Sequence, residues 1–323
     1  MDIGRSQADK KLREIERKIT KIYSRAAKET KEKLQEYLEG YKRRDEKMRE
    51  MVKNGDISAD EYKRWRTGQI IAGNRWIQMT QVLAEDLHNA DKLAESIAKG
   101  YMPEVYAISH NWATYQVEKQ SRLNTNYTLY DRSTVERMIR SNPKLLPDPR
   151  AGSATARKIA ENKALKWNRG KINGAVLQGI LQGEPIDDIA NRLIQVATMS
   201  RNAAVRYART MCTGAENAGR MDSYERVKAM GIQVQKVWLA TLDDRTRDSH
   251  RELDGETRET DEKFSNGCLY PGDPSGEPCE VYNCRCTLIT KINGDNYDVS
   301  QVGRNSKLGD MSYDEWKRGH RDE

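Results

Sequence analysis

The spacing of apolar residues changes once along this chain, and that change constrains the fold more than any other feature. Up to about residue 231, apolar side chains recur every three or four positions, which is the period of an amphipathic helix. In the first predicted helix these positions are Leu12, Ile15, Ile19, Ile22 and Ala26. Two later stretches, 233–239 and 283–292, alternate with a period of two and predict a pair of strands. We therefore predict a mainly α protein, in which long N-terminal helices and a helical middle region precede a small α+β C-terminal module.

The charge content supports long, solvated helices. Of the 323 residues, 33% are charged and 37% are hydrophobic, a balance that suits extended helices better than one large globule. The formal net charge is +7, and residues 1–53 supply most of it, with 17 Lys and Arg against 11 Asp and Glu. A basic helix of this kind can meet DNA phosphates or an acidic protein surface. Because acidic residues are interspersed along it, a solvated face with i,i+4 ion pairs is the competing interpretation.

The N-terminal segment and the cysteines bear on location. Residues 1–18 contain no apolar stretch of the kind that a signal peptide needs, and no apolar run approaches the roughly 20 residues of a membrane span. The chain has five cysteines, an odd number, and four of them lie between 268 and 286. This arrangement does not resemble a disulfide framework, so we expect a reducing cytoplasm and no membrane partner.

Glycine, proline and capping residues divide the chain. Capping boxes at Ser58–Glu61 and Ser133–Glu136 predict helix starts, and breaks are expected around Gly100–Pro103 and at Ser200, which is expected to cap a new helix. Four glycines in the helical middle region predict close helix packing or a bend: Gly170, Gly174, Gly179 and Gly183. The predicted regions are an extended basic helical region (1–121), a linker (122–152), a helical bundle (153–231), the α+β module (232–293) and a polar tail (294–323).

A cluster of acidic, basic and imidazole side chains lies in and around the loop between the two predicted strands. Its members are Asp243, Arg245, Arg247, His250, Asp254, Asn283 and Arg285. One interpretation is an active site, in which His250 activates Cys284 or Cys286 as a thiolate. The other is a buried polar network that fixes a small fold, with Asp243 capping a short helix and Arg247 and Arg285 paired with carboxylates. We favour the structural interpretation and assign no catalytic residue.

The same region offers ligands for a metal. Five side chains suit a tetrahedral zinc ion: His250, Cys268, Cys279, Cys284 and Cys286. A zinc ion would contribute on the order of 10 kcal/mol to the folding of so small a module. The cysteine spacing, C-x10-C-x4-C-x-C, differs from the paired C-x2-C of zinc knuckles. We therefore predict no cofactor and keep zinc as the alternative.

These residues also resemble a known family. The motifs that carry the resemblance are Trp238-x-Ala240-Thr241-x-Asp243-x-Arg245-Thr246-Arg247-x-x-His250, Leu253-Asp254-Gly255, Phe264, Pro271-Gly272-Asp273 and Asn283-Cys284-Arg285-Cys286, with Ala208-Arg209-Thr210 and Asn217-x-Gly219 upstream. They are similar to the C-terminal domain of phage head morphogenesis proteins, the minor capsid proteins related to the F protein of phage Mu. The resemblance covers roughly 170–292. Ser249 and Val281-Tyr282 stand where many relatives carry a further Cys or His, which weighs against a metal.

The resemblance implies a structural role. Its relatives are minor capsid proteins that assist head assembly at the portal or inside the procapsid, so we expect a non-enzymatic virion component made in the cytoplasm of the bacterial host and then held inside the head. The implied partners are the portal protein and the major capsid or scaffold proteins, with packaged DNA a further partner for the basic N-terminal helix. The alternative is a metal- or cysteine-dependent nuclease or hydrolase that acts while DNA is packaged or enters the cell.

Overall fold

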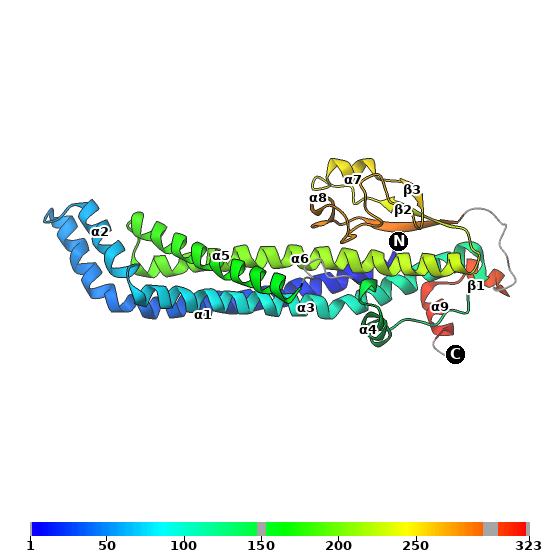
Figure 1. Ribbon diagram of the computed structural model, residues 1–323, viewed down its shortest axis with the longest axis horizontal. Helices are drawn as coiled ribbons and strands as arrows, with labels where there is room; N and C mark the ends of the chain where they lie inside the picture. Colours follow the sequence, from blue (N-terminus) through cyan, green and yellow to red (C-terminus); the bar gives the residue numbers. More distant parts are fainter. Residues whose placement is uncertain (1, 147–152, 293–302, 321–323) are drawn as a thin grey trace. The chain divides into compact units, whose positions relative to one another are not determined.

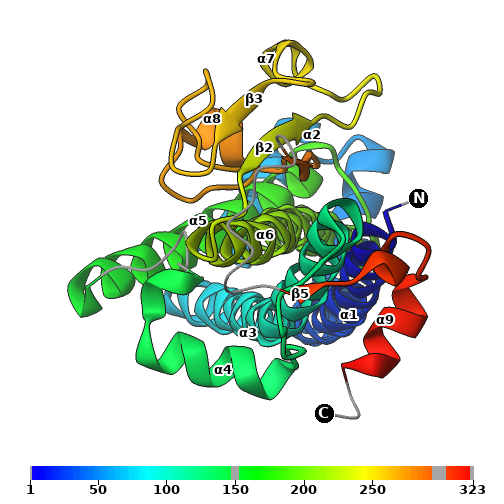
Figure 2. The same cartoon turned by 90° about the vertical axis from the view of Figure 1, so that its right-hand side faces the viewer.

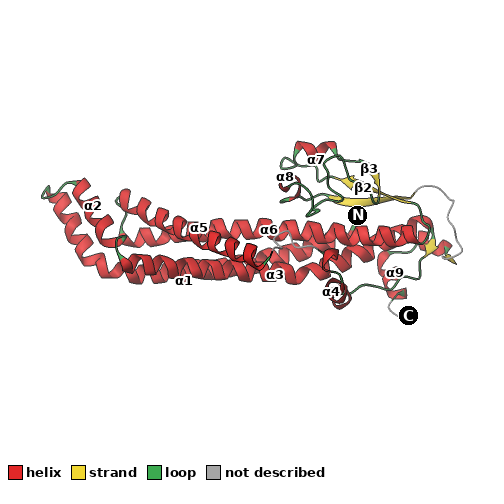
Figure 3. Cartoon of the chain, viewed as in Figure 1, coloured by secondary structure: helices red, strands yellow, loops and turns green. Residues whose placement is uncertain are grey.

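Helices make up most of the computed structural model, which describes residues 2–146, 153–292 and 303–320 (Figures 1 and 3). The α-helices are α1 (Ile3–Asn54), α2 (Ala59–Ile70), α3 (Asn74–Ser121), α4 (Arg132–Ser141), α5 (Ala154–Leu181), α6 (Ile186–Ala229), α7 (Asp248–Glu252), α8 (Pro278–Val281) and α9 (Tyr313–Gly319). Two short 3-10 helices are η1 (Pro143–Leu145) and η2 (Ser306–Gly309). The strands are β1 (Leu123–Asn124), β2 (Val234–Leu239), β3 (Thr257–Glu259), β4 (Thr287–Ile292) and β5 (Gly303–Arg304). The predicted fold class is confirmed: long helices precede a small antiparallel sheet near the C-terminal end.

The chain folds as two compact units. Unit 1 comprises Met1–Glu16, Ala98–Arg150 and Arg206–Glu323, and unit 2 comprises Arg17–Ile97 and Ala151–Val205. These units cut across the five predicted regions, because α1, α3 and α6 each contribute one end to unit 1 and the other to unit 2. No helix within the described ranges is long and apolar enough to cross a bilayer.

The described residues of unit 2 form helices joined by short turns, and the helices pack through the predicted apolar positions. Ile19, Leu34, Leu38 and Leu83 are completely buried in it. Helix α2 starts with the predicted capping box, in which the Ser58 hydroxyl accepts the Glu61 N–H and the Glu61 carboxylate accepts the Ser58 N–H. Between helices, Trp76 Nε1 on α3 donates to Asn173 Oδ1 on α5 at 2.8 Å.

Three of the predicted helix boundaries are wrong. Helix α3 continues through Gly100 and Pro103, and α6 continues through Ser200, which is buried within the helix and does not begin a new one. A proline inside a helix costs about 3 kcal/mol. The neighbouring residues Met102, Val105 and Tyr106 are fully buried, and their burial offsets that cost. Helix α4 is capped by Asp131, which accepts the Thr134 N–H, and not by the predicted Ser133–Glu136 box.

The four glycines of the helical middle region differ in their surroundings. A Cβ at Gly179 would lie 2.9 Å from Ile189, so this glycine does permit close packing of α5 and α6. Gly183 has a φ of +71° in the turn between these helices. At Gly170 and Gly174, by contrast, nothing lies within 4 Å of the position that a Cβ would take, and the predicted close approach is wrong there.

The three-stranded sheet of unit 1 is antiparallel, in the order β3-β2-β4, and lies against the C-terminal half of α6 (Figure 1). The predicted strand pair is confirmed, with a register that runs from Val234↔Ile292 to Leu239↔Thr287. The second strand begins at Thr287 and not at the predicted Asn283. Asn283 adopts a φ of +60°, which turns the chain out of strand geometry before the cysteines.

Segments expected to be a linker and a polar tail contribute to the core of unit 1. One aromatic cluster contains Trp112, Tyr115, Tyr127, Leu308, Tyr313 and Trp316, and the turned view shows α9 beside the N-terminal end of α1 (Figure 2). Strands β1 and β5 join the same two segments. The Trp316 indole N–H donates to the buried Glu118 carboxylate at 2.6 Å. Aromatic residues scattered among polar ones thus anchor both segments, whereas their average composition predicts solvated chain.

Helix α9 begins at Tyr313, within the segment expected to be a polar tail. The remaining parts of the predicted linker and tail, residues 147–152, 294–302 and 321–323, lie outside the described residues.

Candidate functional site

A buried amide on α6 joins this helix to the α+β module. Asn217 accepts the N–H of Leu288 at 2.8 Å and donates to the carbonyl oxygens of Pro271 and Cys286 at 3.1 and 3.3 Å. Arg220, one turn further along, donates to the Leu288 carbonyl at 3.0 Å. Helix α6 therefore fixes both the start of β4 and the loop before it.

Two polar groups of the predicted cluster meet just beyond the end of β2 and the start of β4, where Leu239 pairs with Thr287. Asp243 binds the guanidinium group of Arg285 through both carboxylate oxygens, one of them at 2.6 Å. Hydrogen bonding from Arg285 holds the pKa of Asp243 well below its usual range. Asp243 also accepts the backbone N–H of Arg245 and so stabilises a turn; the prediction that it caps α7 is wrong. Arg5 reaches the same place from α1 and donates to the Arg285 carbonyl at 2.8 Å.

The turn before β4 depends on the left-handed residue Asn283. Its backbone N–H donates to the Thr210 hydroxyl at 2.8 Å, and its side-chain oxygen accepts from Arg209 at 3.0 Å. Both partners lie on α6. The Ala-Arg-Thr motif of that helix therefore serves to hold the Asn-Cys-Arg-Cys turn.

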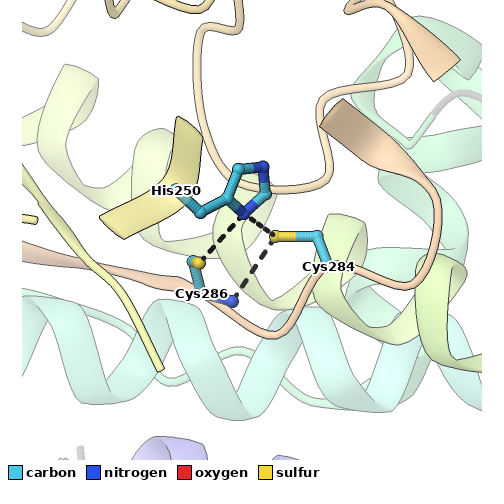
Figure 4. Close-up of side chains that lie close together, drawn as sticks. All are labelled: His250, Cys284 and Cys286. Atoms are coloured by element: carbon cyan, nitrogen blue, oxygen red, sulfur yellow. Dashed lines mark hydrogen bonds between the residues drawn. The ribbon is translucent and has the colours of Figure 1, made fainter. Parts of the chain in front are cut away.

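This turn carries Cys284 and Cys286 to His250. The His250 Nδ1 atom lies 3.7 Å from Cys284 Sγ and 3.3 Å from Cys286 Sγ, and Figure 4 shows both sulfur atoms directed at this nitrogen. The other ring nitrogen, Nε2, lies 3.0 Å from the carboxylate of Glu280 on α8. Trp238 packs edge-on against the imidazole. The exposed fractions of His250, Cys284 and Cys286 are 2%, 1% and 3%.

The two thiols are electrostatically unequal. A hydrogen bond from Cys284 lowers the pKa of Cys286 well below its ordinary value, and His250 acts in the same direction. The same bond, together with burial, raises the pKa of Cys284. The surroundings therefore favour the thiolate form at Cys286 over Cys284, and a favoured thiolate is typical of a nucleophile or of a metal ligand.

Burial decides between these chemistries. The order Cys286, His250, Glu280 matches a nucleophile, a base and an orienting acid. A nucleophile must however reach its substrate, and each sulfur is almost completely covered. The geometry thus favours a structural or metal-binding cluster over an active site.

The remaining predicted site residues lie in separate places. Arg247 donates to the Tyr282 carbonyl, without the predicted carboxylate partner, and Asp254 accepts the Ala240 N–H at 2.9 Å. The side chain of Arg245 is mostly exposed, 3.9 Å from Asp243. Of the five potential metal ligands, only three gather: Cys279 is exposed and Cys268 is buried elsewhere, beside Gly276. None of the five cysteines, all within the described ranges, forms a disulfide.

Sequence reasoning misses Glu280, Arg5 and Arg220. Glu280 follows Cys279 directly, but no spacing rule links it to His250 thirty residues earlier. The sequence singles out Asn217 only through the Asn217-x-Gly219 motif, which gives no indication of the residue's contacts.

Fold and site together define a largely helical protein that bears a small terminal module fixed by a buried polar network. Comparison with known proteins identifies the domain that contains this module. Residues 170–289 match the family described as Phage Mu protein F like protein. The chain thus carries a phage Mu F-like domain, and the resemblance predicted from the sequence is confirmed.

Curated relatives extend the match beyond this domain. Minor head protein GP7 of Bacillus phage SPP1 is 25% identical over 96% of this chain and 94% of its own length. NAD(+)--arginine ADP-ribosyltransferase EFV of Enterococcus faecalis is 26% identical over 71% of this chain. Uncharacterized protein YqbB of Bacillus subtilis is 29% identical over 41% of this chain. The chain spans 45% of each of the latter two proteins. No solved structure matches the chain.

Proposed function

We propose that this chain is a minor head protein of a tailed bacteriophage that docks on the portal or on the inner face of the procapsid. The observation that carries the proposal is the match to GP7, which extends over nearly the full length of both chains. The match of residues 170–289 to the Mu F-like family supports the same role in head morphogenesis. The nuclease or hydrolase alternative has no support from these relatives.

Exposed apolar side chains support docking on protein partners through unit 2. Among the described residues, nine of the twelve large hydrophobic side chains with the greatest exposure belong to unit 2, although it contains fewer than half of the residues. They are Ile77, Val82, Leu93, Ile159, Trp167, Leu177, Leu181, Ile194 and Met199. We propose that side chains of this set contribute to a contact surface for a protein partner.

The basic helix α1 supports contact with packaged DNA less strongly. Several of its cations are paired with acids: Lys11 with Glu104 at 2.8 Å and Arg25 with Glu29 at 2.7 Å. Lys33 is likewise paired with Asp86 at 2.5 Å. Paired cations release fewer counterions on DNA, so protein partners are the better proposal.

The proposed role is non-enzymatic. In the module, the Asp243, Asn283 and Arg285 side chains hold turns and strands, and the buried thiols face His250. The relative named as an ADP-ribosyltransferase is more than twice as long as the matched part, and the proposal does not carry its activity over to this chain. Incubation of the purified chain with NAD and arginine, or with DNA and divalent cations, is expected to give no turnover.

Co-sedimentation tests the docking. The full chain is expressed with the portal, scaffold and major capsid proteins of the same phage, and particles are separated on a gradient. We expect the chain in the procapsid fraction and on isolated portal rings. A Leu93→Ser, Ile159→Ser, Trp167→Ser variant should lose this association, whereas Leu242→Ser, an exposed site in unit 1, should retain it. A chain that remains at the top of the gradient, apart from both procapsids and portal rings, would refute the proposal.

A further inference from the structure

We propose that His250, Cys284 and Cys286 bind a thiophilic metal ion of the zinc class, through Nδ1 of the histidine and the two Sγ atoms. The site lies wholly within unit 1, and the inference is independent of the head-assembly role. Three potential ligand atoms, from α7 and from the turn before β4, lie within 4.8 Å of one another (Figure 4). Among the described residues, it is the one group of three or more His, Cys, Asp or Glu side chains whose potential ligand atoms lie this close together.

The distances fit coordination. Zinc binds cysteine sulfur at about 2.3 Å and histidine nitrogen at about 2.0–2.1 Å, so at a tetrahedral angle the two ligand atoms lie roughly 3.5 Å apart. The observed separations of Nδ1 from the two sulfurs, 3.3 and 3.7 Å, fall on either side of this value. An ion therefore fits with small side-chain movements.

The surrounding groups are those of a metal centre. A metal-bound histidine usually donates its second N–H to a carboxylate, which fixes the ring. Here the Glu280 carboxylate lies 3.0 Å from Nε2 of His250. The same carboxylate accepts hydrogen bonds from the Ser249 hydroxyl and the Asn266 amide. The backbone N–H of Cys286 donates to Cys284 Sγ at 3.4 Å, a contact that stabilises a coordinated thiolate.

The local charge also favours a cation. Two sulfurs and one carboxylate surround a single imidazole, while the nearest guanidinium groups are engaged elsewhere. Arg285 binds Asp243, and Arg247 donates to the Tyr282 carbonyl. A bound divalent ion would balance the negative charge of these groups. It would also join α7 to the turn before β4, two segments that are far apart in the sequence.

Cys268 and Cys279 do not belong to this site. Cys279 is exposed, and Cys268 lies against Gly276, where a Cβ would come within 2.4 Å of its sulfur. The proposal therefore assigns three protein ligands and leaves the fourth position of a tetrahedral ion to water or a small anion. These two cysteines serve as matched controls.

Elemental analysis of the full chain, purified without metal-affinity steps from zinc-supplemented cells, tests the assignment. We expect about one equivalent of metal per chain in the wild type and in Cys268→Ser and Cys279→Ser. In Cys286→Ser and His250→Gln the content should fall at least tenfold. A wild type without metal, or an unchanged content in Cys286→Ser, would overturn the proposal.

A second measurement does not depend on how well the variants fold. Apo wild-type protein is titrated with Co²⁺, and thiolate-to-cobalt charge-transfer absorption is expected to saturate at one equivalent. Alkylation followed by mass spectrometry should show Cys284 and Cys286 protected until a chelator is added, while Cys279 reacts throughout. Rapid alkylation of Cys286 in metal-free native protein, with no cobalt spectrum, would overturn the assignment and indicate a reactive thiolate.

Discussion

The Asn217 side-chain oxygen accepts the backbone N–H of Leu288 at 2.8 Å, and this bond joins helix α6 to strand β4 of the three-stranded sheet in unit 1. The amide group of the same side chain donates to two carbonyl oxygens of the module. One buried side chain thus provides the hydrogen-bond partner of three backbone groups in the module.

Asn217→Ala should therefore destabilise unit 1. A buried polar group without a partner costs about 1–3 kcal/mol, and this change leaves more than one such group without its hydrogen bond. Chemical denaturation followed by circular dichroism measures the loss. The control is Asn202→Ala, an exposed position on the same helix, which should leave unfolding unchanged. Equal midpoints for Asn217→Ala and wild type would contradict the role given to this amide.

Gly219 permits α3 and α6 to approach closely in unit 1. A Cβ at this position would lie 2.4 Å from the Tyr106 carbonyl oxygen. Gly219→Ala should force the helices apart and cost about 1–3 kcal/mol. Gly174→Ala is the control, because nothing lies within 4 Å of its Cβ position and alanine favours a helix by up to about 1 kcal/mol. Thermal unfolding should shift in opposite directions for the two variants, and a shared direction would refute this prediction.

Lys236 should make the free energy of unfolding depend on pH in the alkaline range. Burial lowers its pKa from 10.5 to about 8, against the opposing fields of Glu225 and Asp261. The unfolded chain then binds more protons than the folded chain between these two values, so the contribution of this residue to stability rises with pH from about 8 to 10.5. Its Nζ donates to the Leu269 carbonyl at 2.8 Å.

The measurement is the difference in unfolding free energy between wild type and Lys236→Met, taken at several pH values. This difference should become more favourable to the wild type as pH rises through that window. The comparison cancels other groups that titrate there. A difference that stays constant with pH would show that Lys236 is charged in the folded protein throughout.

Trp316 should hold the C-terminal segment on unit 1. It is fully buried, and its indole N–H bonds the buried Glu118 carboxylate. Trp316→Ala should cost about 3–5 kcal/mol through the cavity it leaves. Trp316→Phe keeps most of the ring and should lose mainly the hydrogen bond. Limited proteolysis near residue 310 should be fastest for alanine and intermediate for phenylalanine, and equal rates would contradict the packing described.

The sequence pattern is sufficient for much of the fold, for a physical reason. The period of apolar residues reflects which side of a helix or strand is buried, so it predicts α1 and the antiparallel pair of β2 and β4. It fails at Pro103 and Ser200, where residues buried on neighbouring turns outweigh local breaking signals. The Mu F-like motifs likewise predict the family, because each of them is a short run of neighbouring residues that can be read directly from the sequence.

Only the tertiary structure decided which side chains meet. Five soft ligands are visible in the sequence, but Cys268 and Cys279 lie apart, while His250 meets two cysteines 34 and 36 residues later. Glu280 joins them from a four-residue helix that no periodicity reveals. The sequence by itself determined the types and order of the elements, because those depend on neighbouring residues. The composition of the buried cluster depends on how distant loops close over α6, and only folding settles that.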